Sequence, residues 1–546
     1  MYHFVQILTP LVLECPAMSV SETDPLIQAL AKPGVLDSPE RDVEVMETHI
    51  SWVLLAGDYA YKIKKPLDLG FLDFSTLEKR YRACLDELRL NRRLAPEIYL
   101  SVVPIFGSRD DPHLSGTGEP VEYAVKMRRF SQDRLLSTLL TKQQVTAELV
   151  DRLARKVADF HLSLPAAAPD SPWGTAEAVW EPVAQNFRQI ESSPLGEEFS
   201  AELESLQCWS RTEYEARRPQ IVQRRSDGWV RECHGDMHLG NMVADDGDVI
   251  IFDCIEFNAA LRWIDTMSEV AFLVMDLTDR DAPELAARFL NRYLELTGDY
   301  AGLSVLRFYL VYRAMVRAKV NAIRFQQENA EEGSATEAKA EAANYLSLAT
   351  RFIHPSRPFI ALTYGLSGCG KTTYAQALLE RTFALRIRSD VERKRLAGLL
   401  PEARSRSVLD QGIYQREMTE KTYRRLLELC EATVAAGWPV IVDATFLQEQ
   451  QRAPFLALAR SVDAPLVILE FTASTETLEQ RIRRRDAEKS DASEATLEVL
   501  HEQQRRIEPL TTAERESSVR IDTEQQAADG EWIDEVLGRL GPRSRY

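Results

Sequence analysis

Hydrophobic and polar positions alternate in the first part of the chain. Residues 46–64 alternate on both sides of a Gly-Asp pair at 57–58, which predicts two strands joined by a turn. Helical spacing follows over residues 77–94, and a strand-like segment covers residues 122–127. A long amphipathic helix is expected over residues 144–162. This part of the chain is therefore predicted to have an α+β fold, in which strands precede helices.

The helical pattern returns over residues 285–325, after two short apolar strands at 241–243 and 249–252. The turn between these strands is the sequence Asp-Asp-Gly-Asp at residues 245–248. Residues 326–343 are polar and rich in Glu and Ala. We expect the latter segment to be a solvated helix or a loose connection.

The pattern changes after a proline-containing segment at residues 354–358. An apolar strand at 359–363 runs directly into a glycine-rich turn, and further strands at 439–443 and 465–471 alternate with helices. Such alternation predicts an α/β fold with a parallel, doubly wound sheet. We therefore expect two domains, over residues 20–354 and residues 355–546.

Composition excludes several classes of protein. The 546 residues include 66 Lys and Arg against 84 Asp and Glu, a formal net charge of −18, and 45% are hydrophobic. A chain of this length can bury several cores without disulfides or structural metals. Its acidic charge argues against a protein that coats nucleic acid, although a local basic groove stays possible. The seven cysteines form no CxxC pair, which favours reduced thiols in the cytoplasm over disulfides or a zinc site.

The first residues resemble a signal sequence only superficially. They lack a basic leading segment, and Thr9-Pro10 and Glu14 interrupt the apolar run. We expect Met18 to be the true start, or residues 1–19 to be a disordered extension. No stretch approaches the roughly 20 apolar residues that would span a bilayer, so no membrane association is expected.

The glycine-rich turn matches the phosphate-binding pattern GxxxxGK[ST] between a predicted strand and a predicted helix. Its backbone amides and the start of the helix would surround the phosphates of ATP. Lys371 would reach the β- and γ-phosphates, and the hydroxyl of Thr372 would hold Mg²⁺. The expected nucleotide-binding residues are Gly365, Leu366, Ser367, Gly368, Cys369, Gly370, Lys371, Thr372 and Thr373.

Three further features follow this loop. Asp443 ends an apolar strand and is either a helix cap or, as the phosphate loop upstream favours, the second anchor of the Mg²⁺ shell. Asp390 either accepts a proton from an attacking hydroxyl, with Arg393 holding a substrate anion, or caps a helix. Arg481 and Arg485 share a helix face and either close over the triphosphate or form a solvated surface.

Residues 357–546 resemble the small P-loop kinases that phosphorylate metabolites or nucleic-acid ends, such as gluconate, shikimate, polynucleotide and zeta-toxin-like kinases. The resemblance is strongest at the phosphate loop. It implies that Asp390 activates the acceptor hydroxyl and that the arginine helix is a lid. The acceptor stays open, and nucleic acid would enter only as an end hydroxyl.

A second dense cluster is the sequence His-Gly-Asp-Met-His-Leu-Gly-Asn at residues 234–241. Asp236 and Asn241, five residues apart, suit a phosphoryl-transfer loop in which one side chain accepts a proton and the other binds Mg²⁺. Asp253 ends the next apolar strand and adds an oxygen ligand. His234 and His238 lack a third ligand for zinc, and His234 is expected to brace the loop.

This part, from about residue 40 to residue 350, resembles the aminoglycoside phosphotransferase-like branch of the protein-kinase fold, whose loop has the pattern HGDxxxxN. The resemblance implies that Asp236 is the catalytic base and that Asn241 and Asp253 bind Mg²⁺. It also implies that Lys62 holds the α- and β-phosphates and pairs with Glu87. Lys64 lies on the same strand face, so the choice between the two lysines stays open.

The sequence departs from the pattern of this branch at two places, and the resemblance implies a role for a third. Residues 127–129 would form the hinge that meets adenine, while no glycine-rich loop covers the phosphates. The metal strand ends in Phe-Asp-Cys rather than Asp-Phe-Gly, which suggests that no regulatory flip occurs. Arg313 and Arg317, one helical turn apart, either face an anionic substrate or, as we expect, form a solvated face. The residues expected to be core or packing residues are Trp52, His161 and Trp263.

The order of the two halves resembles a bacterial family of bifunctional aminoglycoside phosphotransferase-like and ATP-binding proteins. We therefore predict a cytoplasmic, Mg²⁺-dependent ATP phosphotransferase with two modules, each acting on a small-molecule hydroxyl. Two alternatives are a regulatory ATP-binding protein with little transfer activity and an enzyme that modifies aminoglycosides. The sequence leaves the acceptors and the oligomeric state open.

Overall fold

The structure, a computed structural model, describes residues 24–36, 43–48, 50–68, 72–327, 332–401, 403, 416–488 and 496–540. The expected extension over residues 1–19 lies outside these ranges. The chain divides into two compact units. One combines the residues up to Asp281 with Val305–Ile353, and the other combines Ala282–Ser304 with the residues from His354 onward.

The first unit begins with a sheet. Its strands are β1 (Glu44–Glu47), β2 (Ser51–Ala56), β3 (Tyr59–Lys64), β4 (Tyr99–Gly107), β5 (Pro112–His113) and β6 (Glu122–Arg128). They lie in the order β1-β2-β3-β6-β4-β5, and all neighbours are antiparallel. Helix α2 (Leu77–Asn91) packs against β4 and β6. The predicted hairpin, the predicted helix and the predicted strand over residues 122–127 are therefore confirmed.

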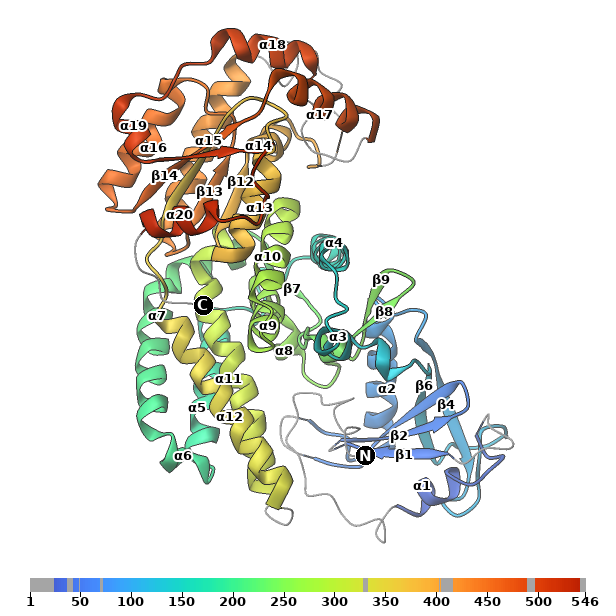
Figure 1. Cartoon of the computed structure of the whole chain (residues 1–546). Helices are drawn as coiled ribbons and strands as arrows, with labels where there is room; N and C mark the ends of the chain where they lie inside the picture. The colour runs from blue at the N-terminus through green and yellow to red at the C-terminus, as the bar shows by residue number, and fades with distance from the viewer. Residues whose placement is uncertain are drawn as a thin grey trace. The chain divides into compact units, whose positions relative to one another are not determined.

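The rest of the first unit is mainly helical (Figure 1). Its helices are α1 (Pro25–Leu30), α3 (Leu136–Thr141), α4 (Ala147–Ser163), α5 (Ala176–Glu191), α6 (Leu195–Glu198), α7 (Ser200–Ser226), α8 (Ala259–Arg262), α9 (Thr266–Asp279), α11 (Leu303–Gln327) and α12 (Glu332–Ile353). Strands β8 (Met242–Asp245) and β9 (Asp248–Ile251) form the predicted hairpin. A second pair joins β7 (Val230–Glu232) to β10 (Trp263–Asp265).

Helix α12 corrects the expectation of a solvated or loose segment over residues 326–343. Its residues Ala338, Ala342 and Leu346 are all at most 2% exposed. These small and apolar side chains recur every four residues, which places them on one face of the helix. The segment therefore contributes a buried face to the first unit, although its composition is polar.

The second unit contains a sheet of five parallel strands. They are β11 (Ile360–Tyr364), β12 (Leu385–Arg388), β13 (Val440–Asp443), β14 (Leu466–Thr472) and β15 (Ser518–Asp522). The strand order β12-β13-β11-β14-β15 confirms the predicted parallel α/β fold. The chain passes from β11 to one side of the sheet and later to the other, so the loop after β11 lies where the winding reverses. Ligands of open α/β sheets bind at such points.

The remaining elements of the second unit are helices. They are α10 (Pro283–Thr297), α13 (Lys371–Thr382), α14 (Ser389–Leu396), α15 (Arg416–Ala435), α16 (Glu449–Ser461), α17 (Thr475–Glu488), α18 (Leu497–Arg506), α19 (Thr512–Glu516) and α20 (Trp532–Leu540). The helical pattern expected over residues 285–325 is thus two helices, α10 and α11. Gly298, with φ +75°, ends the first in the left-handed conformation that glycine tolerates.

Helix α10 packs against α13 and β12 of the second unit (Figure 1). Asn291 accepts a hydrogen bond from the backbone nitrogen of Arg386 (2.6 Å) and donates one to the backbone oxygen of Ala384 (3.0 Å). Strand β12 is an edge strand, so these bonds satisfy backbone groups that no neighbouring strand reaches on that side. Composition gave no sign of this packing.

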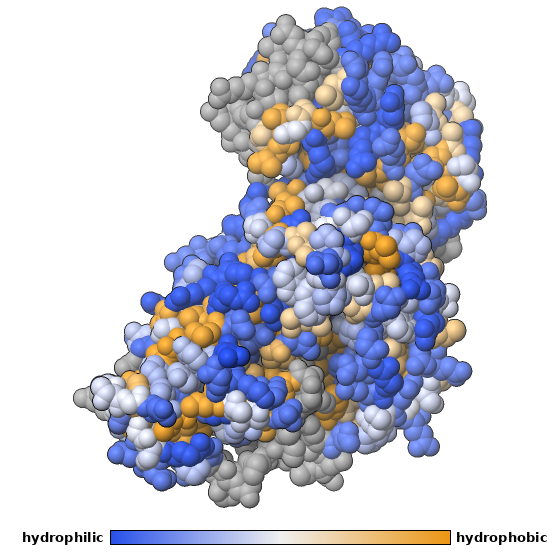
Figure 2. All heavy atoms as spheres, turned by 180° about the vertical axis from the view of Figure 1, so that it is seen from behind, coloured by the Kyte–Doolittle hydropathy of each residue, from blue (hydrophilic) through white to orange (hydrophobic). Residues whose placement is uncertain are grey.

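The face of the molecule drawn in Figure 2 is mostly hydrophilic. On the face shown in Figure 2, hydrophobic residues form small groups separated by hydrophilic side chains. Scattered apolar residues of this kind are ordinary on a protein surface. Within the described ranges, each helix is too short or too polar to traverse a lipid bilayer.

Candidate active sites

The cluster at residues 234–241 forms a buried turn between β7 and β8. The Nδ2 atom of Asn241 donates hydrogen bonds to Oδ2 (2.9 Å) and to the backbone oxygen (3.0 Å) of Asp236. Burial would raise the pKa of the Asp236 carboxyl, but His238 and His234 outweigh it and hold that pKa below its usual value. Asp236 is therefore a buried, ionised carboxylate, as a proton acceptor requires.

Helix α9 holds this turn through two buried carboxylates. Glu269 accepts hydrogen bonds from the backbone nitrogens of Gly235 (2.5 Å) and His234 (3.2 Å). Asp276 accepts one from the backbone nitrogen of Leu239 (2.8 Å). Gly235 has φ +90°, and a Cβ there would lie 2.8 Å from the backbone oxygen of Leu261. The turn thus requires glycine at residue 235, and α9 holds its backbone in place.

The expected lysine–glutamate pair is present. Lys62 Nζ lies 2.9 Å from Oε1 of Glu87 and 2.8 Å from Oδ1 of Asp253. Lys64 Nζ lies 2.6 Å from Oε2 of Glu87 and also pairs with Glu256. Because Lys62 alone of the two lysines contacts Asp253, the geometry favours Lys62 as the phosphate-binding residue. The assignment of its role remains a prediction.

Glu256 is a site residue that the sequence did not indicate. It completes a buried cluster of two lysines and three carboxylates, together with Lys62, Lys64, Glu87 and Asp253. Burial alone would lower the pKa of Lys62, but Asp253 and Glu87 raise it well above its usual value. Glu256 lies only three residues after Asp253, but no spacing rule relates it to a lysine 192 residues earlier.

The arginines of α11 are not a solvated face. Arg313 is 3% exposed and donates hydrogen bonds to the backbone oxygens of Ser268 (3.1 Å) and Gly235 (3.2 Å). Burial would lower the pKa of Arg317, but Tyr345 and Asp276 outweigh it and raise that pKa. The prediction was wrong because α11 is apolar on most of its circumference and is buried, so its charged residues bond inward.

Asp236, the expected proton acceptor, and Asp253, an expected metal ligand, each keep one carboxylate oxygen that receives no hydrogen bond from the described residues. Oδ1 of Asp236 and Oδ2 of Asp253 are buried, and within the described part of the chain neither has a hydrogen-bond partner. A buried carboxylate oxygen without a donor is costly unless a cation compensates it. Such oxygens suit Mg²⁺, which prefers hard oxygen ligands.

A different set of groups lies behind this turn. Within the described ranges, the side chains of His161, Cys233 and Glu269 are close enough together to hold a metal ion. Glu269 is already bonded to two backbone nitrogens, and Nε2 of His161 lies 2.9 Å from its Oε2. His161 was expected to be a core or packing residue, and it is fully buried; it also contacts the glutamate that holds the turn.

In the second unit, the predicted phosphate loop connects β11 to α13. Gly365, Gly368 and Gly370 have φ values of +148°, +86° and +89°. A Cβ on Gly365 would lie 2.7 Å from the backbone oxygen of Phe471. Lys371 Nζ donates to the backbone oxygens of Gly365 (3.0 Å) and Leu366 (2.8 Å), so the lysine side chain curls over the loop. This backbone forms an anion-binding concavity.

The expected metal-side residues of this unit lie together. Thr372, in the first turn of α13, donates a hydrogen bond from Oγ1 to Oδ2 of Asp443 (2.9 Å). Asp443 ends β13, which lies beside β11 in the sheet. A hydroxyl and a carboxylate in contact at the end of a phosphate loop are suitable Mg²⁺ ligands.

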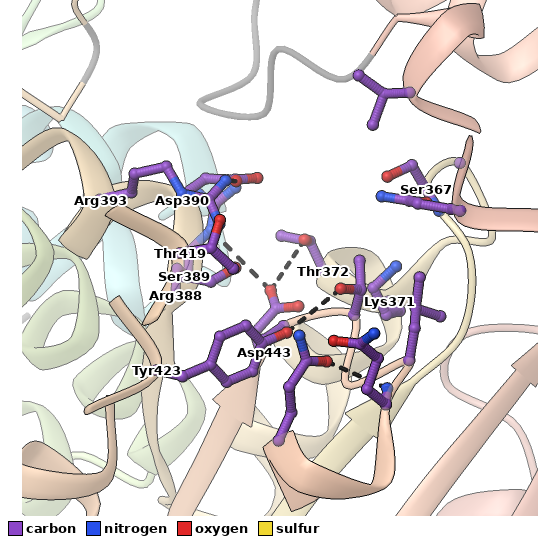
Figure 3. A pocket seen from close by; sticks show the side chains of 18 of the residues that line it. Ser367, Lys371, Thr372, Arg388, Ser389, Asp390, Arg393, Thr419, Tyr423 and Asp443 are labelled. Carbon is purple, nitrogen blue, oxygen red and sulfur yellow. Dashed lines mark hydrogen bonds and ion pairs between the residues drawn. The ribbon is translucent and has the colours of Figure 1, made fainter. Parts of the chain in front are cut away.

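A cavity of about 1610 Å³ opens over this loop. Figure 3 shows Asp390 and Arg393 on one wall and Ser367 on the other, with Thr372 and Asp443 between them. Oδ1 of Asp390 lies 3.7 Å from NH1 of Arg393. Pockets for one small molecule are typically 300–1,000 Å³, so this cavity has room for a nucleotide and an acceptor.

The arginine helix is confirmed as α17. Arg481 and Arg485 both line the cavity. Arg481 donates from NH1 to the backbone oxygen of Gly368 (3.4 Å) and to Oγ1 of Thr523 (2.8 Å). It therefore lies directly against the phosphate loop. Closure of this helix as a lid remains a prediction.

Several cavity residues were missed by sequence reasoning. Gln503 accepts a hydrogen bond from the backbone nitrogen of Ser367 (2.8 Å), and the Tyr423 hydroxyl lies 3.3 Å from Oγ1 of Thr445. Arg388 ends β12, one residue before the predicted Ser389-Asp390 pair. Its position beside that pair could have marked it as a cavity residue. The others lie on distant helices, with no motif to mark them.

Comparisons with known proteins match the two halves separately. Residues 71–309 match the phosphotransferase enzyme family, and residues 360–510 match an AAA domain family. An uncharacterized protein of Mycobacterium tuberculosis is 32% identical over 455 residues, which cover 83% of this chain and 88% of that protein. The similarity thus extends through both units.

Solved structures resemble one half each. An amicoumacin kinase in complex with AMP-PNP, Ca²⁺ and amicoumacin covers 60% of this chain and 93% of its own, at 14% identity and a TM-score of 0.38. A sugar kinase from Janibacter sp. HTCC2649 covers 34% of this chain and 94% of its own, at 22% identity and a TM-score of 0.26.

Proposed function

We propose a function from one premise: the chain belongs to the family of bifunctional aminoglycoside phosphotransferase-like and P-loop ATP-binding proteins, in which a kinase-like domain precedes a small P-loop domain. Both matched families support an ATP-dependent phosphotransfer role. The finer proposal is that each unit transfers the γ-phosphate of ATP to the hydroxyl of a small molecule.

In the first unit, Asp236 accepts the proton of the attacking hydroxyl. Its buried position and its bond to Asn241 hold the carboxylate in one orientation, so the proton acceptor is placed before the acceptor binds. Lys62, held by Glu87, contacts the α- and β-phosphates. Asn241 and Asp253 would hold Mg²⁺, which neutralises phosphate charge when bound.

In the second unit, the amides of the phosphate loop and Lys371 bind the triphosphate. Thr372 and Asp443 would hold Mg²⁺, and Asp390 accepts the hydroxyl proton. Arg481 and Arg485 add positive charge on the other side of the phosphates. The observation that carries the proposal is that each unit gathers a lysine, two metal-side oxygen ligands and a further carboxylate from separate segments.

Charge in the second cavity indicates the acceptor class. Among the described residues, its lining contains nine Lys and Arg side chains against four Asp and Glu, in a chain whose formal net charge is −18. Because Mg²⁺ offsets part of the triphosphate charge, ATP alone does not balance this excess. We infer that the acceptor of the second unit is an anionic hydroxyl compound, whose anion lies near Arg388 and Arg393.

The test is a screen for phosphorylated products by mass spectrometry with a pool of metabolites. Asp236→Asn is expected to abolish one set of products, and Lys371→Ala a different set, with an effect of about 10²–10⁴-fold in each case. Products of the Lys371-dependent set are expected to be acids or phosphate esters. If neither variant changes turnover, the chain is instead a regulatory ATP-binding protein. If aminoglycosides alone gain phosphate through the first unit, it is an antibiotic-modifying enzyme.

A further inference from the structure

A buried glutamate on α10 is connected to the metal-side residues of the second unit. Glu295 is 2% exposed, and its Oε1 lies 2.9 Å from NH2 of Arg386. Its Oε2 lies 3.9 Å from NH1 of Arg388. Helix α10 lies within the range that matches the phosphotransferase family, yet it packs with the second unit. The carboxylate therefore comes from outside the matched P-loop range, residues 360–510.

Both arginines reach the end of the phosphate loop. Arg386 donates from NH1 to the backbone oxygen of Thr372 (3.1 Å). Nε of Arg388 lies 4.0 Å from Oδ2 of Asp443. That same carboxylate oxygen accepts the hydroxyl bond from Thr372 (2.9 Å). Glu295 is thus one side chain removed from each of the two expected Mg²⁺ ligands.

Arg388 lies between two carboxylates, Glu295 and Asp443, at nearly equal distances. Burial would raise the pKa of Glu295, but the guanidinium groups of Arg386, Arg388 and Arg292 outweigh it and hold that pKa below its usual value. Glu295 is therefore charged and attracts Arg388. Without that charge, Arg388 loses the attraction that opposes Asp443, and an arginine paired more closely with Asp443 competes with a cation for it.

We propose that Glu295 is a positioning residue of the second site: it holds Arg388 back from Asp443, so that Asp443 stays available to Mg²⁺. This role depends on the function proposed above for the second unit. It also makes α10 a part of that site, although the helix ends more than 60 residues before the phosphate loop begins in the sequence.

The experiment measures binding of AMP-PNP to the full-length protein by calorimetry, with Mg²⁺ and with EDTA. Binding to the second unit is the component that Lys371→Ala removes. Glu295→Gln keeps the side-chain shape and a hydrogen-bond acceptor for Arg386. It is expected to weaken this component about 10- to 100-fold with Mg²⁺, the usual effect of losing an outer partner of a metal ligand, and less than about twofold with EDTA.

Two further variants separate positioning from a structural role. Arg388→Gln added to Glu295→Gln is expected to restore Mg²⁺-dependent binding, because the competing cation is gone. Glu380→Gln is the matched control: Glu380 on α13 pairs with Arg288 on α10 (2.9 Å) but contacts no metal-side residue. This variant is expected to bind like the parent.

Equal weakening of Glu295→Gln in Mg²⁺ and in EDTA would overturn the positioning role, and so would a failure of Arg388→Gln to restore binding. Those results leave the Lys371-dependent component intact and the proposed function standing. If Lys371→Ala removes no component from the parent protein, the function proposed for the second unit is wrong, and the role of Glu295 falls with it.

Discussion

The two sites differ in how they hold their charges. In the first unit, Lys62, Asp236 and Asp253 are all at most 3% exposed, and the lysine is paired with carboxylates on two sides. In the second unit, Lys371 and Asp390 line an open cavity, and Lys371 bonds to backbone oxygens rather than to a carboxylate. One site is a closed ion network, and the other is a basic cavity.

The difference affects stability as well as chemistry. A buried charge that loses its partner stays desolvated, so the closed network links the proposed catalytic residues to the folding of the first unit. Water screens the charges of an open cavity, so they can be changed with little effect on folding. The same chemistry is therefore expected to respond differently to substitution in the two units.

The largest expected effect is on folding. Lys62→Met removes a buried cation and leaves Glu87 and Asp253 undercompensated, so we expect the free energy of unfolding of the first unit to fall by about 3–5 kcal/mol. Lys371→Met is expected to change the free energy of unfolding of the second unit by less than about 1 kcal/mol. Hydrogen–deuterium exchange of peptides from β3 and from β11 reports each unit separately. Equal losses would contradict the contrast between closed and open sites.

Acid provides a second comparison. Burial would raise the pKa of Glu87, but Lys62 and Lys64 outweigh it and lower that pKa to about 2. Between about pH 4.5 and about pH 2 the unfolded chain binds a proton that the folded chain does not, so stability present above this window is lost as the pH falls through it. We expect a loss on the order of 3 kcal/mol in the first unit.

The control for this loss is Glu87→Gln, which removes the titrating group. The variant is less stable at neutral pH, but its stability is expected to depend less on pH within the window. Chemical denaturation at several pH values, followed by hydrogen–deuterium exchange of α2 peptides, gives the slope of the free energy of unfolding against pH for the parent and for the variant. Parallel slopes for parent and variant would show that Glu87 does not carry the acid sensitivity.

The smallest expected effects lie on the arginine helix of the second unit. Arg481 bonds to Gly368 of the phosphate loop and to Thr523, and we expect Arg481→Ala to raise the Kd for ATP about tenfold. Arg483 on the same helix is 62% exposed and pairs with Glu479. Arg483→Ala is therefore expected to change the Kd for ATP less than about twofold. Calorimetry of both variants checks the difference. Equal effects would mean that bulk charge, rather than contact with the loop, binds the nucleotide.

The two functional loops were predictable because each is local. Residues 365–372 bend by their own glycines, and Asp236 and Asn241 meet because five residues form one turn. Strand periodicity likewise predicted β2, β3 and the parallel sheet. The wrong predictions concern which helix faces are exposed to solvent. The polar composition of α12 and the arginines of α11 suggested exposed faces, whereas the surrounding helices bury them.

Sequence alone therefore determined the order of the two folds and the two loops that we propose as active sites, since turn geometry and strand spacing depend on neighbouring residues. Tertiary structure decided which lysine contacts Asp253, that Glu256 and Arg313 belong to the first site, and that α10 brings Glu295 to the second. Those contacts join segments that lie tens to nearly two hundred residues apart. Their partners are selected by packing and by the high cost of leaving a buried charge unpaired, and neither is encoded in local spacing.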